Sequence, residues 1–243
     1  LTLVATVSFL DDLRPLPNRY RIGAQFVGMA LLLYETGLMS NDTWVVVGLL
    51  VVGVGILNAY NFMDGINGMT AWYSLVCVGT LWFWHRQLQL PSSNVVLPFA
   101  FIALLLFSYV NARQRAVCFA GDVGSVSMGF IILLPLIQII HKTHSYLPVL
   151  ILAVYGVDTV LTILHRLYQR QNIFQAHRQH LFQWLVHKLK WSHLHVSALY
   201  AAIQLIVNIL VIRATNWQAE YQWGLAGGVL ALLAGVYIAL KRK

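Results

Sequence analysis

Residues 44–62 read WVVVGLLVVGVGILNAYNF and continue directly into MDGING at 63–68. No charged residue interrupts the run before Asp64. The run also lacks the strict alternation of apolar and polar residues that marks a half-buried strand. Because a helix needs about 20 apolar residues to cross a bilayer, this stretch predicts a membrane-spanning helix that ends in a polar turn.

Similar apolar runs recur along the chain, and they predict eight full transmembrane helices. We place them near residues 22–38, 44–62, 69–85, 95–111, 125–141, 146–164, 196–212 and 222–240. Residues 1–10 are too short to cross, so we expect a partial helix there and missing N-terminal helices before it. The predicted fold class is all-α, a polytopic integral membrane helix bundle forming one membrane-embedded domain over residues 1–243.

The composition of the chain agrees with embedding in a membrane. The 243 residues are 59% hydrophobic and 10% charged, whereas soluble domains are about 45–50% apolar and about 25% charged. This balance excludes an ordinary soluble enzyme, a disordered protein and a nucleic-acid-binding domain. The two cysteines, Cys77 and Cys118, are too few for a disulfide framework or a Cys-rich zinc site.

The basic residues predict the orientation of the bundle. If the segment 11–21 is cytoplasmic and the spans alternate, 13 of the 16 Lys and Arg residues fall on the cytoplasmic side. Arg86, Lys142 and Arg213 are the three that do not. An excess of basic residues in cytoplasmic loops is the usual topology signal, so we expect a multi-pass membrane protein with this side in the cytoplasm.

Only eight acidic residues occur in the chain, so their positions are informative. Asp11, Asp12, Asp64 and Asp122 all fall at predicted cytoplasmic helix ends, and Asp158 lies inside the span 146–164 near the same face. Ionisable groups at membrane depth usually have a partner or a function. Since Mg²⁺ commonly binds one or two carboxylates together with substrate phosphates, we expect a divalent cation and a phosphorylated ligand here rather than simple helix caps.

Two polar motifs contain three of these carboxylates. Residues 11–17, DDLRPLP, place an acidic pair at the end of an apolar helix. Residues 58–68, NAYNFMDGING, close another span. Asn58, Asn61 and Asp64 are three residues apart and therefore share one helix face. The alternative for this stripe is a helix end whose asparagines bond neighbouring helices.

A third motif, GDVGS at 121–125, leads into the span 125–141. A Gly-rich turn at a helix N-terminus presents free N–H groups that suit a phosphate, and Asp122 in the same turn can hold a metal. No Gly-Lys-Ser/Thr follows, so this is not a Walker loop. Simple N-capping by Asp122 is the alternative.

The longest polar stretch, 165–195, is predicted to be a cytoplasmic substrate loop. It contains His177-Arg178-Gln179-His180-Leu181-Phe182-Gln183. Arg178 and a histidine suit contact with phosphate, whereas a solvated basic loop facing anionic lipid is the alternative.

These four motifs, in this order and on one face, resemble those of the polyprenyl-phosphate N-acetylhexosamine-1-phosphate transferases (glycosyltransferase family 4). Residues 11–17 are similar to the family's DDxxxLP loop, 58–68 to its NxxNxxDGxDG loop, 121–129 to its GDxGSxxxG loop, and 177–183 to its His-containing loop. The resemblance implies transfer of a sugar-1-phosphate from a UDP-sugar to undecaprenyl phosphate, with Mg²⁺ (or Mn²⁺) as cofactor and release of UMP.

The resemblance also implies roles for particular residues. Asp122, with Asp64, would hold the metal, and Asp11 and Asp12 would serve the lipid phosphate. Further substrate contacts would come from a larger set of polar residues in the same loops: Asn58, Asn61, Asn67, Gly121, Ser125, His177, Arg178 and His180. The expected partners are a UDP-N-acetylhexosamine, undecaprenyl phosphate and membrane lipid, and a homodimer is left open. The resemblance also implies a bacterial plasma (inner) membrane protein with its active site on the cytoplasmic face.

Two departures from the family pattern concern the sugar donor. Asn67 stands where many members have a second Asp, and Phe182 and Gln183 replace further histidines. The form of this loop favours the branch that initiates O-antigen synthesis over the peptidoglycan branch. We also expect Phe182 to pack against an apolar face of the sugar, unless it only anchors the loop.

Two other functions remain as alternatives. One is the phospho-MurNAc-pentapeptide transferase of peptidoglycan synthesis. The other is a cation-coupled transporter, whose sites usually lie at the bilayer midplane on broken helices within repeats. A lipid phosphotransferase of the CDP-alcohol type is excluded, because its D-G-x-x-A-R signature does not follow Asp64.

Overall fold

The computed structural model describes all residues except 91–94, 173–177 and 242–243. The described residues contain helices and no strand. In chain order the elements are α1 (Thr2–Leu13), α2 (Asn18–Glu35), the 3₁₀ helix η1 (Leu38–Ser40), α3 (Thr43–Met63), α4 (Met69–Gln87), α5 (Val96–Asn111), α6 (Gly121–Thr143), the 3₁₀ helix η3 (Leu147–Leu152), α7 (Ala153–Tyr168), α8 (Leu181–His187), α9 (His193–Ala214) and α10 (Ala219–Lys241).

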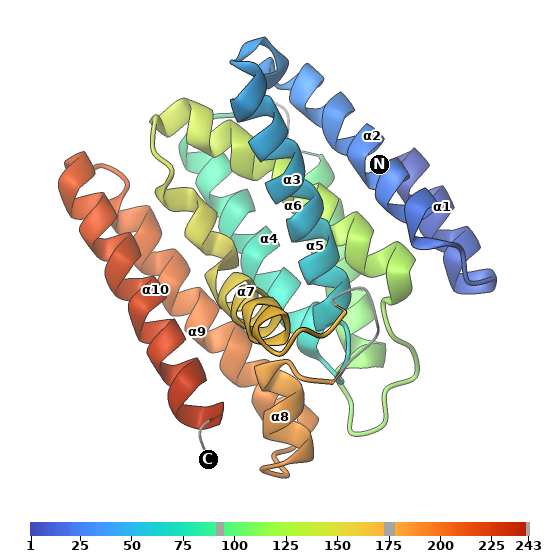
Figure 1. Cartoon of the computed structure of the whole chain (residues 1–243). Coiled ribbons are helices and arrows are strands. Elements are labelled where there is room, and N and C mark those ends of the chain that lie inside the picture. Colours follow the sequence, from blue (N-terminus) through green and yellow to red (C-terminus); the bar gives the residue numbers. More distant parts are fainter. Residues whose placement is uncertain (91–94, 173–177, 242–243) are drawn as a thin grey trace.

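Helix α4 lies in the middle of the bundle and packs against α5, α6 and α9. The pair α1 and α2 covers one side, where α1 packs on α6, and α10 lies on the opposite side against α7 (Figure 1). A large core surrounds α4, with Tyr73, Cys77 and Leu81 fully buried. A smaller core joins α1, α2, α3 and α6.

A small residue allows the close approach of α2 and α3 in this smaller core. A Cβ atom at Gly53 would lie only 2.2 Å from Cε of Met29. Small residues at helix contacts are typical of membrane bundles, because packing replaces the hydrophobic effect between helices there.

The prediction of an all-α polytopic membrane bundle is confirmed, and each of the eight expected spans coincides with a helix. Among the described residues, five helices are long and apolar enough to cross a membrane: α3, α6, η3 with α7, α9 and α10. Three expected spans do not qualify: α2, which carries Arg19, Arg21 and Glu35; α5, which has only 16 residues; and α4, which is long enough but not apolar enough. The expected number of full spans is therefore larger than the number that qualifies by length and composition.

The span expected at 146–164 is not one regular helix. It begins as the 3₁₀ helix η3 and becomes α-helical at Ala153. The side chain of Gln204 on α9 forms hydrogen bonds with backbone groups where the 3₁₀ helix becomes α-helical. Its Oε1 accepts from the N–H of Val154 (3.0 Å) and its Nε2 donates to the carbonyl of Leu150 (2.8 Å).

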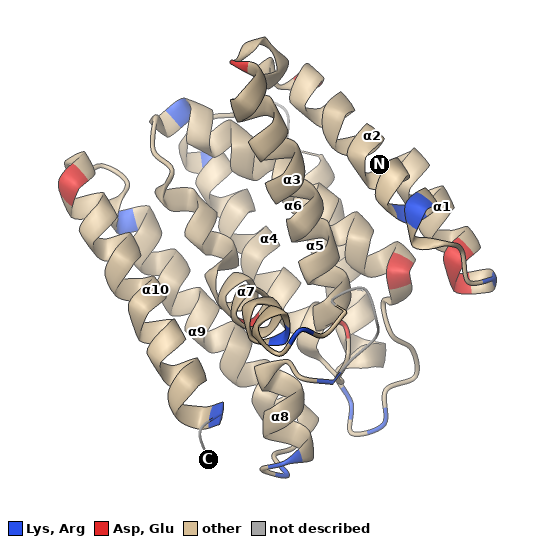
Figure 2. Ribbon diagram, viewed as in Figure 1, with Lys and Arg blue, Asp and Glu red and all other residues tan. Residues whose placement is uncertain are grey.

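The charged residues divide between the two ends of the bundle. Figure 2 shows most Lys and Arg residues at one end of the bundle. The acidic residues that end α1 and α3 and begin α6 lie at the same end of the bundle. Asp42 precedes α3 and Glu220 lies in the first turn of α10, so both belong to the other end. We call the first of these the basic end.

Candidate active site

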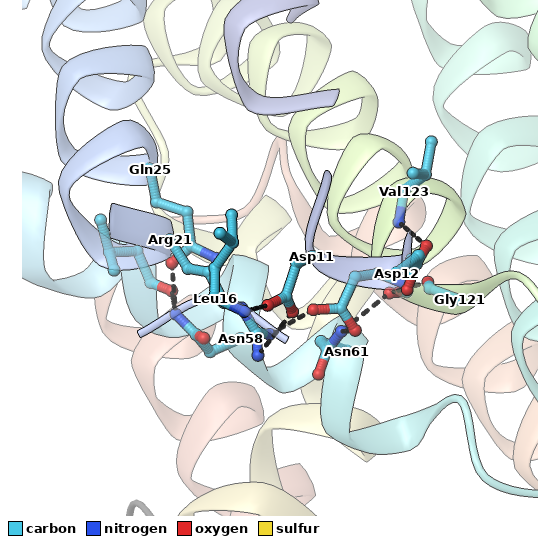
Figure 3. A network of polar contacts seen from close by, with 12 residues as sticks. Asp11, Asp12, Leu16, Arg21, Gln25, Asn58, Asn61, Gly121 and Val123 are labelled. Carbon is cyan, nitrogen blue, oxygen red and sulfur yellow. Dashed lines mark hydrogen bonds and ion pairs between the residues drawn. The ribbon is translucent and has the colours of Figure 1, made fainter. Parts of the chain in front are cut away.

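Four carboxylates converge on the first turn of α6 at the basic end. Asp122 is the second residue of α6, and Asp64 directly follows α3. Asp11 and Asp12 lie in the last turn of α1, at a helix end as the sequence predicts. Three segments far apart in the chain thus bring together the four predicted catalytic residues. Figure 3 shows two of them, Asp11 and Asp12, within the network of polar contacts.

Two of these carboxylates occupy the N-terminus of α6. Asp64 Oδ2 accepts from the N–H of Gly121 (3.0 Å). Asp12 accepts from the N–H groups of Asp122 (3.1 Å) and Val123 (3.2 Å). Negative charge at a helix N-terminus is stabilised by the helix dipole. The structure therefore corrects the expectation that these N–H groups are free to bind a phosphate.

Gly121 makes this arrangement possible. Its φ is +63°, in the left-handed region that glycine adopts most easily. A Cβ atom at this position would lie 2.8 Å from Oδ2 of Asp12. Both the turn and the close approach of Asp12 thus require glycine.

The guanidinium of Arg21 connects two of the carboxylates. Its Nη1 lies 3.1 Å from Oδ2 of Asp11, and its Nη2 forms an ion pair with Oδ2 of Asp122. In the sequence, Arg21 is only one of the basic residues that indicate topology. The turn of residues 14–17, which folds α2 back beside α1, places it at the site. Arg21 therefore pairs with two of the four carboxylates, and among the described residues no cation forms an ion pair with Asp12 or Asp64.

The polar stripe on α3 divides between two roles. Asn61 Nδ2 donates to Oδ1 of Asp122 (2.6 Å) and to Oγ of Ser125 (3.3 Å), so it fixes the Asp122 side chain. Asn58 Nδ2 instead donates to Oε1 of Gln25 on α2 (2.7 Å). Asn58 therefore makes the contact between helices that was the alternative for this stripe.

Asp64 is held in a largely dehydrated position. Burial raises the pKa of its carboxyl group above the ordinary range, and the charge of Asp122 acts in the same direction. Hydrogen bonds from the Thr70 hydroxyl (2.7 Å) and the N–H of Gly121 oppose this shift. A bound cation would favour the charged form of such a carboxylate.

Asn67 lies away from this cluster and ties two segments together. Its Nδ2 donates to the carbonyls of Arg113 (2.7 Å) and Gln114 (3.0 Å), and its Oδ1 lies 3.2 Å from Nδ1 of His193. The amide thus anchors the segment between α5 and α6 to α9. Its predicted contact with substrate stays a prediction.

The stretch expected to be a loop at 165–195 contains the short helix α8, and His180 caps its start. His180 is 1% exposed, and its Nδ1 lies 3.3 Å from Oδ1 of Asp158. Asp158 also accepts from the N–H groups of Leu181 (2.8 Å) and Phe182 (3.3 Å) and from the hydroxyl of Tyr200 (2.7 Å). Asp158, noted in the sequence only as an acid inside a span, is thus the anchor of α8.

The remaining residues of this motif are placed differently. Arg178 is exposed at the basic end, whereas His177 lies outside the described residues. Phe182 is fully buried, and its ring lies 3.2 Å from the position that a Cβ of Gly65 would take. Phe182 therefore packs against the 58–68 motif, and the expectation that it faces the sugar is wrong for this structure.

The acidic cluster suits a hard divalent cation by its chemistry. Its carboxylate donors offer only oxygen, and one guanidinium does not neutralise them. Among the described residues, no three or more His, Cys, Asp or Glu side chains are grouped closely enough to hold a metal by themselves. Mg²⁺ usually takes only one or two carboxylates and completes its shell with water and phosphate. Asp122 and Asp64 fit that requirement.

The fold and the site together define a multi-pass α-helical membrane protein with an acidic site at one end of its helices. Residues 1–141 match the family model described as glycosyl transferase family 4. Because this match covers more than half of the chain, the protein belongs to that family.

The curated relatives are enzymes that transfer different sugar phosphates, as their names state. The phospho-N-acetylmuramoyl-pentapeptide-transferase of Thermotoga neapolitana is 28% identical over 178 residues, covering 72% of this chain and 56% of the relative. A probable undecaprenyl-phosphate N-acetylglucosaminyl 1-phosphate transferase of Bacillus subtilis is 25% identical over 204 residues, or 76% of this chain and 56% of the relative. The undecaprenyl-phosphate alpha-N-acetylglucosaminyl 1-phosphate transferase of Escherichia coli K12 is 28% identical, over 51% of this chain and 36% of the relative. The chain thus spans about half the length of these relatives, or less.

Proposed function

We propose that the protein transfers N-acetylhexosamine-1-phosphate from a UDP-sugar to undecaprenyl phosphate and releases UMP. An oxygen of the acceptor phosphate attacks the phosphorus that carries the sugar, and the bond from that phosphorus to UMP breaks. The observation that carries this proposal is the convergence of Asp11, Asp12, Asp64 and Asp122 on the start of α6.

The position of the acidic cluster suits an acceptor lipid with a charged head and an apolar tail. It lies at the ends of apolar helices, so a polyprenyl tail can remain in lipid while its phosphate reaches the carboxylates. A soluble nucleotide sugar can approach the same end from water. We place this end on the cytoplasmic face of the plasma membrane, because most basic residues lie there.

The chain's own residues would position and neutralise the reacting phosphates. Joining two anions makes charge neutralisation and alignment the main catalytic task. Mg²⁺, held by Asp122 and Asp64, would supply part of the neutralisation. Arg21 would supply another part, since it already lies between two carboxylates and can turn toward a phosphate. Asp11 or Asp12 would activate the acceptor phosphate.

The identity of the donor divides the proposal into two branches. We favour an N-acetylhexosamine donor in O-antigen-like synthesis, because residues 177–183 have the form of that branch. Relatives of the peptidoglycan type support phospho-MurNAc-pentapeptide transfer as the second candidate. A homodimer stays a prediction.

The test is transfer by the full-length protein to undecaprenyl phosphate in detergent. UDP-GlcNAc, UDP-GalNAc and UDP-MurNAc-pentapeptide are supplied separately, with Mg²⁺, with Mn²⁺ or with a chelator. UMP and the lipid-linked product are measured together. We expect UMP and lipid product in equal amounts with a UDP-N-acetylhexosamine, and loss of both with the chelator.

Asp122→Asn sharpens this test because it removes charge but little volume. Asn61 can still donate to the retained side-chain oxygen, so folding should survive while activity falls about 100-fold or more. Glu35→Gln, at the other end of the bundle, is the matched control. No UMP with any donor would exclude the transferase and favour a transporter, whereas best use of the pentapeptide donor would move the protein to the second branch.

A further inference from the structure

A second site lies at the basic end, between α7, α8 and the end of α10. A cavity of about 480 Å³ opens there. Its lining includes His165, Arg178, Trp184, Lys188, Tyr237 and Lys241. All of these residues follow the segment that matches the family model, which ends at residue 141. In Figure 1, α7 and α3 separate α10 from the acidic cluster at α1 and α6.

The cavity lining contains several basic side chains. Arg178 and Lys188 are exposed, and Lys241 is half-buried. Within the described part of the chain, none of these three side chains forms an ion pair with a carboxylate. Such a group of cations around a cavity suits an anion, above all a phosphate, whose oxygens accept several charge-assisted hydrogen bonds.

Lys241 is held in place on the wall of this cavity. Its Nζ donates to the backbone carbonyl of Gln179 and to the hydroxyl of Tyr237 (2.6 Å). The Tyr237 hydroxyl in turn lies 2.8 Å from Oγ1 of Thr162 on α7. The cation is therefore positioned before any ligand arrives, and it connects α10 to the residue that precedes His180.

Part of the cavity lining is apolar. Trp184 contributes an aromatic side chain to it, and Ile238 is 45% exposed. Farther along α10, Leu232 is 68% exposed, and Tyr237 is the only buried residue of this helix. Aromatic residues commonly lie at the level of the lipid headgroups. A ligand with a charged head and hydrocarbon chains would satisfy both the cations and this face.

We propose that the cavity between α7, α8 and α10 binds the phosphate group of an anionic phospholipid, with Lys188 and Lys241 as its cationic ligands. The acyl chains would lie along the exposed face of α10. Basic pockets between transmembrane helices are a known way of holding such headgroups. Free phosphate could form the same ionic contacts, but it has no hydrocarbon chains that would contact the apolar wall. The bound lipid would join α10 to α8 and to the segment that leads into His180.

The experiment measures binding by the purified full-length protein, and it needs no activity. Phosphatidylglycerol, phosphatidylcholine and inorganic phosphate are titrated separately into delipidated protein in detergent. Retention is followed by native mass spectrometry, and thermal stabilisation is followed in parallel. We expect tight retention of phosphatidylglycerol and a rise in melting temperature. Phosphatidylcholine and inorganic phosphate at equal concentration should have neither effect.

The variant Lys188→Gln/Lys241→Gln should bind phosphatidylglycerol roughly 30-fold more weakly, because each lysine near an anionic lipid contributes about a factor of five. The control Lys142→Gln/Arg213→Gln removes the same charge at the other end and should bind as the wild type does. If Lys241→Gln prevents folding, Lys188→Gln alone should give about a five-fold loss, since Lys188 is exposed at the end of α8.

Three results would overturn the proposal. The first is unchanged phosphatidylglycerol binding in the Lys188 variants. The second is an equal loss in the pocket and control variants, which would indicate only a general charge effect. The third is inorganic phosphate binding as tightly as phosphatidylglycerol through the same lysines, which would assign the cavity to free phosphate.

Discussion

Asp158→Asn tests whether a single buried carboxylate anchors α8. The carboxylate accepts hydrogen bonds from the N–H groups of Leu181 and Phe182 and from the Tyr200 hydroxyl, and it pairs with His180. Asparagine has nearly the same shape but offers one acceptor oxygen and one NH₂ group. The N–H groups of Leu181 and Phe182 bond different oxygens of Asp158, so in the variant one of these N–H groups would face an NH₂ donor.

The expected cost follows from these contacts. A hydrogen bond to a charged acceptor contributes about 1.5–3 kcal/mol, so the two N–H bonds at the start of α8 together contribute about 3–6 kcal/mol. Asp158 is only 2% exposed, so water does not replace the lost hydrogen bonds. We therefore expect α8 to lose about 3–5 kcal/mol of local stability, which is roughly a 10²- to 10⁴-fold rise in its opening equilibrium.

Amide hydrogen exchange of the purified protein measures this opening directly. Protection in residues 181–187 should fall by the factor given above, while protection in α4 at the centre of the bundle stays unchanged. The control is Thr159→Val. The Thr159 hydroxyl is buried and has no hydrogen-bond partner among the described residues, so this change should leave α8 unaffected.

Two outcomes would refute the reasoning. If Asp158→Asn left the exchange of α8 unchanged, the carboxylate would not be its anchor. If protection fell equally in α4, the residue would stabilise the bundle as a whole and not the capped end of α8.

Three further predictions use other parts of the structure. Gly121→Ala should lower the free energy of unfolding by about 1–2 kcal/mol, because alanine disfavours the left-handed backbone. The added Cβ should also displace the Asp12 carboxylate and reduce the rate of sugar-phosphate transfer. A normal transfer rate would contradict this prediction. Phe182→Ala should lower the free energy of unfolding by about 3–5 kcal/mol in denaturation experiments. Phe182→Leu should leave the preference among sugar donors unchanged, and an altered preference would indicate that Phe182 contacts the sugar. In a variant without the exposed Cys118, an impermeant thiol reagent should label a cysteine at Ser40 in intact cells and not one at Asn18; the reverse would invert the topology.

The fold class and the site were predictable for different reasons. Spans such as 44–62 are uninterrupted apolar runs, and their length alone predicts a membrane helix. Asp11, Asp12, Asp64 and Asp122 could be grouped because the positive-inside pattern places their helix ends on one face. A one-dimensional pattern was therefore sufficient to identify which end of the bundle carries the carboxylates.

The contacts within the site could not be read from the same patterns. Arg21 reaches Asp122 only because the turn at 14–17 folds α2 beside α1, and sequence spacing does not give that angle. The occupation of the α6 N–H groups by Asp12 likewise depends on how closely two helix ends approach. Phe182 was assigned to the sugar because an aromatic in a polar loop suits either burial or binding, and only tertiary packing separates the two.

The change from 3₁₀ to α geometry at residues 147–154 has a consequence for the order of assembly. In a lipid environment each unpaired backbone group is costly, and Gln204 supplies the partners for Leu150 and Val154. Gln204 lies about 50 residues later in the chain, so α9 is synthesised after the segment that needs it. The irregular segment can therefore take its final shape only once α9 has inserted beside it, and this step belongs to the late stage of folding.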